Sequence, residues 1–431
     1  MRVLFITSSY PSHRDDPRGI FIHRLARGFR REGVQVTVIA PGVPSAPACE
    51  TLDGVEVQRP MYWIRRWQRL GTEPGGILPT LRRHPWLLLQ VPPLVAALTR
   101  RALSLAPAFD VIHAHWLYPA GIAGVIAAKR WDIPLIVTGH GSDLNLATDW
   151  RAIRLIVRQI SRAADACVGV SRALCEQFVA IGVPSERVRF ISSIFDPQNE
   201  LPLRNGETSA ALQLFRAFEG FRLLYVGSLI QGKSVETLLD AHHDLQRRGH
   251  PVACAIVGVG PDRSHLDRIV RGRSQPNVLF VGAQPPYSVP MWMSSAHLLI
   301  HPSLSEGRPN VILEAMMLGL PVVATEIPGT TELVLDRATG LLFPPRDVKK
   351  LADCIEELMG DQDLREAIGR RARGYIQAEG ITVAQAVRHH IALYEQLCAV
   401  RKQEPLQANS QPAMRTHHDA GVGQDDPSPE R

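Results

Sequence analysis

Short apolar runs alternate with amphipathic segments along most of the chain. The first run, RVLFIT at 2–7, ends in small polar residues and is followed by a helical pattern over 19–31. Helical patterns likewise separate the later apolar runs, which lie at 34–41, 110–115, 134–140, 166–171 and 188–192. Short buried strands that alternate with helices are typical of a parallel α/β sheet.

A second series of the same kind begins after a polar, irregular stretch at 195–219. It starts with FRLLYVG at 221–227 and ends with three helical patterns, the last over 382–400. The two series predict an α/β fold of two Rossmann-like, doubly wound domains that face each other across a cleft. We expect a first domain at 1–195, a linker at 196–220 and a second domain at 221–380. A C-terminal helix at 381–400 could cross back to the first domain, and the tail at 401–431 should be disordered.

The composition narrows the class of protein. A length of 431 residues suits two domains, and no apolar stretch reaches the roughly 18 residues of a membrane-spanning helix, so we expect a cytoplasmic protein. The six cysteines lack a C-x-x-C pair, which favours reduced packing residues over a disulfide framework or a zinc site. Residues 1–195 hold 24 Lys and Arg against 14 Asp and Glu, whereas the remainder holds 24 against 28. The basic half suits an anionic substrate or membrane surface, and without a nucleic-acid motif we expect no nucleic-acid partner.

The segment 61–105 combines tryptophans and arginines with leucine runs. These residues are Trp63, Trp67, Trp86, Arg65, Arg66, Arg69, Arg82 and Arg83. Such a mixture suits an element that faces a membrane interface or forms the floor of a lipid acceptor site. The alternative is an ordinary insertion whose tryptophans pack inward.

The most informative segment is HPSLSEGRPNVILEAMMLGLPVVAT at 301–325. We expect Asn310 to cap a helix, so that the first N–H groups without an intrahelical acceptor lie at about Val311 and can bind a diphosphate. Glu314 lies one turn inside this helix, where its carboxylate can accept hydrogen bonds from ribose hydroxyls. Glu306 precedes the helix and can approach a sugar.

This block resembles the E-x7-E region of retaining glycosyltransferases of family 4, which have the GT-B fold. The shared residues are Pro302, Ser303, Glu306, Gly307, Pro309, Asn310, Glu314, Ala315, Met316 and 319–325. LLYVGSLIQGKSVETLLDA at 223–241 and PGTTELVLDRATGLLFPPRD at 328–347 resemble the same family, and PSHRDDPRGIF at 11–21 resembles its exopolysaccharide-type members. The resemblance covers about residues 1–400.

The resemblance implies a nucleotide-sugar donor site in the second domain and an acceptor side in the first. Lys233 stands where the family has the lysine that holds the donor diphosphate, and Ser228 stands where many members have arginine. Arg308 is the candidate substitute for that arginine. Gly19 would let the backbone approach a phosphate opposite Lys233.

Further candidates follow two strands of the first domain. His140 and Asp143 come directly after the strand at 134–140, where open α/β sheets place their ligands. By the resemblance, His140 is the cleft histidine that contacts the transferred sugar. Asp143 joins the candidates for the acceptor side, which include His115, Trp116 and Tyr118. No acidic ligand pattern accompanies these histidines, so we expect no metal site.

The implied reaction transfers a sugar from a nucleotide-diphosphate sugar to an acceptor hydroxyl with retention at the anomeric carbon. Glu306, His140 and Lys233 would act at the reacting centre, with no cofactor and no metal. We expect a glycan or lipid-linked acceptor, in cell-surface polysaccharide or lipid-linked glycan synthesis, and peripheral contact with the anionic inner face of the cell membrane. A GT-B sugar-nucleotide epimerase and a non-catalytic sugar-nucleotide-binding protein are the alternatives.

Overall fold

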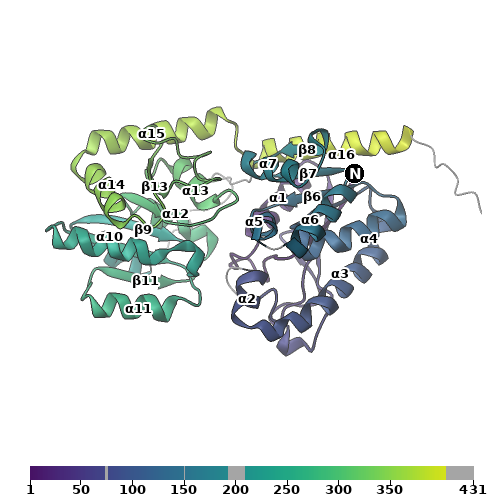
Figure 1. Ribbon diagram of the computed structural model, residues 1–431, viewed down its shortest axis with the longest axis horizontal. Coiled ribbons are helices and arrows are strands. Elements are labelled where there is room, and N and C mark those ends of the chain that lie inside the picture. The colour runs from purple at the N-terminus through teal and green to yellow at the C-terminus, as the bar shows by residue number, and fades with distance from the viewer. Residues whose placement is uncertain (73–75, 150, 193–208, 404–431) are drawn as a thin grey trace, which may run out of the picture.

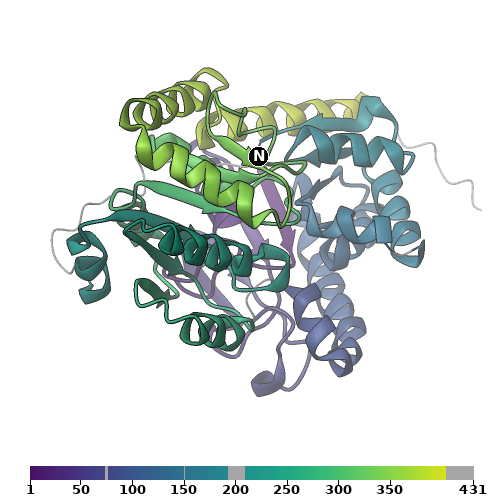
Figure 2. The ribbon, with the colours of Figure 1, turned by 60° about the vertical axis from the view of Figure 1, so that its left-hand side comes forward.

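Two parallel sheets, one in each half of the chain, form the centres of two domains (Figure 1; Figure 2). They are seen in a computed structural model that describes residues 1–72, 76–149, 151–192 and 209–403. Each sheet is covered by helices on both faces, which confirms the predicted pair of doubly wound domains.

Eight strands form the sheet of the first domain. In spatial order they are β3 (Cys49–Leu52), β4 (Val55–Gln58), β2 (Gln35–Ile39), β1 (Arg2–Thr7), β5 (Val111–His115), β6 (Leu135–Gly139), β7 (Ala166–Gly169) and β8 (Val188–Phe190). All neighbours pair in parallel except β3 and β4. The central position of β1, β5 and β6 brings the residues that follow them to one edge of the sheet.

The strands β3 and β4 form a hairpin that the hydrophobic pattern does not predict. Leu52 pairs with Val55, which leaves a loop of two residues, Asp53 and Gly54. Both have positive φ, of 47° and 81°, as a type I′ turn requires. The dipeptide Asp-Gly between two short runs is therefore the signal by which this hairpin can be found in the sequence.

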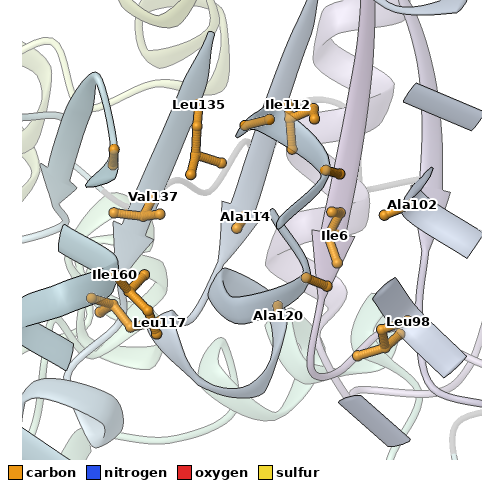
Figure 3. Packing of buried hydrophobic residues seen from close by; sticks show 14 of the residues in the cluster. Ile6, Leu98, Ala102, Ile112, Ala114, Leu117, Ala120, Leu135, Val137 and Ile160 are labelled. Atoms are coloured by element: carbon orange, nitrogen blue, oxygen red, sulfur yellow. The ribbon is translucent and has the colours of Figure 1, made fainter. Parts of the chain in front are cut away.

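Alternation along the strands divides the core of the first domain into two layers. Leu4 and Ile6 of β1 face a cluster that includes Leu98 of α3 and Ile160 of α6 (Figure 3). Phe5 faces the opposite cluster, which contains side chains of α1 and α16. The helices of this domain are α1 (Ile20–Arg31), α2 (Ile77–Arg83), α3 (Val91–Leu105), α4 (Ile122–Trp131), α5 (Ser142–Asp149), α6 (Arg151–Ala163) and α7 (Arg172–Ala180).

The segment 61–105 packs into the core only in part. Leu70 and Leu87 are fully buried. Trp67, Trp86 and Leu89 are 51%, 54% and 71% exposed, respectively. The exposed residues belong to two short helical turns, η1 (Arg65–Trp67) and η2 (Pro85–Gln90). Trp63 is also exposed, so the interpretation in which the tryptophans pack inward is wrong, although leucines of the same segment join the core.

Six parallel strands form the sheet of the second domain. Their spatial order is β11 (Val278–Gly282), β10 (Val252–Val257), β9 (Phe221–Val226), β12 (Leu298–His301), β13 (Val322–Thr325) and β14 (Leu341–Phe343). The helices are α9 (Ala210–Ala217), α10 (Val235–Arg247), α11 (Arg263–Gly272), α12 (Val289–Met293), α13 (Asn310–Leu318), α14 (Val348–Gly360) and α15 (Gln362–Ala378).

The stretch expected to be irregular at 195–219 contains the helix α9, which corrects that expectation. Ser209 caps this helix by accepting a hydrogen bond from the Leu212 N–H, and Leu212 and Phe215 pack into the core of the second domain. Of its three large apolar side chains only Leu212 and Phe215 are buried, and a helix of eight residues is too short for hydrophobic periodicity to reveal it. Residues 196–208 of the expected linker, and 404–431 of the expected tail, lie outside the described residues.

The last helix, α16 (Val383–Gln403), lies along the first domain although it follows the second in sequence (Figure 1). The hydroxyl of Tyr394 is 2.6 Å from Nδ1 of His113, and its ring stacks on Phe29 with centroids 5.5 Å apart. Arg401 pairs with Asp165 at 3.1 Å. Among the residues that the structure describes, no helix is both long and apolar enough to cross a membrane.

Replacing Tyr394 by Ala should destabilise the first domain. The ring is fully buried, so its loss leaves a cavity and an unpaired His113 nitrogen, at a cost of about 3–5 kcal/mol. Urea denaturation followed by circular dichroism measures the effect. Val400→Ala, an exposed site on the same helix, is the control and should change stability by no more than about 0.5 kcal/mol. Equal stability of the two variants would contradict the docking of α16.

Candidate functional site

A cavity of about 520 Å³ lies between the two domains. The turn after β1 and the start of α1 form its first-domain wall, and the residues at the carboxyl ends of β9, β10 and β11 form the opposite wall. The carboxyl ends of strands from both sheets therefore meet at one cleft, where open α/β sheets bind their ligands. The volume is within the range of small-molecule sites.

The carboxylate of Glu306 is the centre of a charged cluster beyond the ends of β9 and β12. Its Oε1 accepts hydrogen bonds from Lys233 Nζ at 2.5 Å and from His301 Nε2 at 2.8 Å. Burial alone would raise the pKa of Glu306, but the Lys233 charge and the His301 hydrogen bond together hold it well below its usual range. Glu306 is therefore ionised at neutral pH.

His301 also belongs to this cluster, and it is not among the residues predicted from the sequence. It is the last residue of β12 and its side chain is buried. A histidine at the carboxyl end of a strand, five residues before a candidate carboxylate, is the signal that could have identified it.

Glu314 lines the cavity and pairs with a cation of the other domain. Its Oε1 lies 3.1 Å from Nη1 of Arg24, which is buried on α1 and lines the same cavity. No local pattern in the sequence indicates this role of Arg24, because its partner lies 290 positions away.

The helix α13 begins at Asn310, one residue earlier than the expected capping role of Asn310 requires. Pro309 is the N-cap residue, with φ −74° and ψ 109°, and Asn310 and Val311 are the first two helical residues. The expectation that Asn310 caps the helix is therefore corrected. Proline can occupy the cap because it has no N–H to leave without an acceptor.

Gly19 and Ser228 both line the cavity, on opposite walls. Gly19 has φ 62°, and a Cβ at this position would lie 2.4 Å from the carbonyl oxygen of Ser9, so only glycine fits. Arg308 points elsewhere: its Nη1 is 3.4 Å from Oε2 of Glu332. Within the described part of the chain, Lys233 and Glu306 are also outside this lining, and their charged groups meet each other instead.

His140 and His115 lie against each other on the first-domain side. His140 Nε2 is 3.3 Å from His115 Nδ1, and the His140 ring contacts Trp116 and Phe21, two residues that line the cavity. Burial lowers the pKa of His140 to about 3, and the nearby His390 adds to the shift. The ring is therefore neutral at pH 7, able to donate or accept a hydrogen bond without carrying charge.

Asp143 organises the backbone around these histidines. Its two carboxylate oxygens accept four hydrogen bonds of 3.1–3.2 Å, from the N–H groups of Leu117, His140, Gly141 and Leu144. Both oxygens are thus occupied, and the turn after β5 is joined to the turn after β6. Asp143 thus holds the backbone of the site in place, and it also lines a smaller pocket beside the main cavity.

Tyr118 and Trp116 reach a smaller apolar pocket beside the main cavity. The two pockets share Ser8, Ser9 and Trp116 among their lining residues. Within the described ranges, no group of three or more His, Cys, Asp or Glu side chains is arranged to hold a metal ion.

Comparison with known families gives two matches that follow one another along the chain. The glycosyltransferase family 4 model matches residues 19–199, and the glycosyl transferases group 1 model matches residues 220–361. The putative teichuronic acid biosynthesis glycosyltransferase TuaC of Bacillus subtilis is 28% identical over 402 residues, which is 88% of this chain and 94% of that protein.

A second relative and a solved structure agree with this family. The Nocardia farcinica D-inositol 3-phosphate glycosyltransferase is 30% identical over 378 residues, which is 82% of this chain and 79% of that protein. The Anabaena protein HepE, solved in complex with UDP and glucose, superposes with a TM-score of 0.71 over 92% of this chain and 100% of its own, at 20% identity. The fold is thus GT-B, and the chain belongs to glycosyltransferase family 4.

Proposed function

We propose that this glycosyltransferase uses a nucleotide-diphosphate sugar as donor and transfers the sugar to an acceptor hydroxyl with retention at the anomeric carbon. The observation that carries the proposal is the Lys233–Glu306 pair, placed at the strand ends of the same domain as Glu314 and next to His140 of the other domain. The bound UDP and glucose of the Anabaena neighbour support a donor of this class.

Each charged group has a role that its position supports. Lys233 holds the donor diphosphate, helped by the first N–H groups of α13, and Glu314 accepts hydrogen bonds from the ribose. Glu306 and His140 orient the sugar from opposite domains. Without the donor, Lys233 donates a hydrogen bond to Glu306, and the two charges form an ion pair. The donor must therefore bind beside this preformed pair.

The reaction exchanges one bond of the anomeric carbon for another. The bond to the diphosphate oxygen breaks, the bond to the acceptor oxygen forms on the same face, and the acceptor proton passes to the departing phosphate oxygen. Lys233 and the α13 N-terminus stabilise the negative charge that develops on the leaving diphosphate. No cofactor or metal ion takes part in this scheme.

The exposed tryptophans of the first domain form a surface that we assign to membrane contact. Gln90 Nε2 donates to the Trp67 carbonyl at 2.8 Å, which holds η1 beside η2. Exposed apolar side chains and arginines are therefore adjacent, a combination that binds anionic lipid surfaces. They are Met61, Trp63, Ile64, Trp67, Trp86, Leu88, Leu89, Arg65, Arg66, Arg82 and Arg83.

This membrane-facing surface is connected to the cleft. Arg18 Nη1 donates to the Gly71 carbonyl at 2.9 Å, and both residues line the cavity. The connection supports a lipid-linked acceptor, in synthesis of cell-surface polysaccharide or lipid-linked glycan, with the enzyme peripheral on the inner face of the cell membrane.

Replacing Lys233 by Ala should raise the Kd for UDP, GDP or ADP, whichever binds the wild-type protein, roughly 10- to 150-fold. The variant loses a charge-assisted contact of about 1.5–3 kcal/mol. Glu314→Ala should weaken the same binding through the ribose, whereas Glu306→Gln should lower kcat more than nucleotide affinity. Calorimetry gives the affinities, and sugar transfer assays give the rates.

The matched control is Lys350→Ala, an exposed lysine on α14, which should leave both quantities unchanged. A Lys233→Ala protein with wild-type affinity and rate would contradict the donor-site assignment.

Turnover should be independent of divalent metal, because cationic side chains and a helix N-terminus take its electrostatic role. The rate in excess EDTA should equal the rate in magnesium or manganese. Loss of activity with EDTA and its recovery with manganese would overturn this expectation.

Replacing Arg65, Arg66 and Arg83 by Glu should release the protein from anionic phosphatidylglycerol vesicles, since each exchange turns attraction into repulsion. Co-sedimentation measures the bound fraction. Arg247, Arg271 and Arg373, exposed in the second domain, provide a control triple exchange of equal charge, which should leave binding intact. Wild-type protein that never binds such vesicles would refute the membrane assignment.

A further inference from the structure

The two domains touch through the backbones of glycine-containing loops. A Cβ on Gly307 would lie 2.2 Å from the carbonyl oxygen of His140 and 3.1 Å from Cα of Gly141. The loop that carries Glu306 therefore rests directly against the loop that carries His140. A third loop, after β13, supports this contact from behind, because a Cβ on Gly329 would lie 2.5 Å from the Gly307 carbonyl oxygen.

The third loop also carries Glu332, whose carboxylate reaches the first domain. Its two oxygens accept hydrogen bonds of 2.8 Å from the backbone N–H groups of Arg172 and Ala173, the first two residues of α7. Ser171 caps the next free position by accepting from Leu174. A carboxylate of one domain thus completes the N-terminus of a helix in the other, where helix N–H groups and dipole favour negative charge.

Arg308 links Glu332 to the loop of Glu306. Its guanidinium is almost fully buried, with Nη1 3.4 Å from Oε2 of Glu332 and its centre 5.5 Å from the Phe190 ring, over which Arg172 also lies at 5.0 Å. Burial lowers the pKa of Arg308, and the Glu332 charge opposes that shift. Because Arg308 follows Gly307 directly, a displacement of Glu332 is transmitted to the contact between Gly307 and His140.

We propose that Glu332 is a positioning residue that clasps the two domains and, through Arg308, holds Glu306 opposite His140. The proposal rests on the proposed function, in which Glu306 and His140 orient one sugar from opposite domains. Within the described residues, neither Glu332 nor Arg308 lines the cavity. The clasp therefore acts on the closed arrangement required for transfer, while the nucleotide contacts of the second domain remain in place.

Two variants open the clasp in different ways. Glu332→Gln keeps the side-chain size but removes the charge that Arg308 and the α7 N-terminus require. Gly307→Ala inserts a methyl group whose three nearest neighbours all belong to the first domain, so it pushes the two domains apart. Each should lower kcat at least tenfold while the Kd for the donor nucleotide changes less than about threefold. Glu326→Gln, an exposed carboxylate just after β13, is the matched control.

Small-angle X-ray scattering of the unliganded proteins gives a readout that does not depend on activity. Glu332→Gln and Gly307→Ala should have a larger radius of gyration than the wild type and Glu326→Gln. Unchanged scattering, an unchanged kcat, or a nucleotide affinity that falls as much as kcat would overturn the clasp. If the variants are expanded but the wild-type protein transfers no sugar from any nucleotide sugar, the clasp is supported and the proposed function is refuted.

Discussion

The negative charge of Glu306 is the constraint on which the rest of the site depends. A carboxylate that is nearly removed from water is costly unless a cation and hydrogen-bond donors compensate it. Lys233 and His301 provide this compensation, and they come from the ends of two neighbouring strands, β9 and β12. The parallel sheet of the second domain is what brings these ends together.

The first domain places two neutral histidine rings, His140 and His115, on its side of the site. Burial keeps His140 and His115 uncharged. The carboxylate of Asp143 accepts hydrogen bonds from four backbone N–H groups. Around Glu306 the compensating cation therefore comes from the second domain and the neutral histidines from the first, while the first-domain cation Arg24 pairs with Glu314. This division suits a reaction in which negative charge develops on the diphosphate while the sugar is held by hydrogen bonds.

The relative position of the two sides depends on contacts between distant parts of the chain. Gly307 allows two loops to meet backbone to backbone, Arg24 pairs with Glu314 across the cleft, and α16 returns from the second domain to pack against Phe29 and His113. Each of these contacts joins segments more than 160 positions apart in the sequence, and together they make the two domains one site.

The sequence by itself determined the two α/β domains, because strand and helix periods report which face of each segment is buried. Its motifs also selected Glu306, Glu314, Lys233 and His140, since the resemblance rests on local runs of residues. The sequence did not predict that Arg24 and Glu332 belong to the site, because the local pattern around a charged residue is the same whether it faces water or another domain. Only the packing of the domains decided their partners, as it decided that Arg308 turns to Glu332.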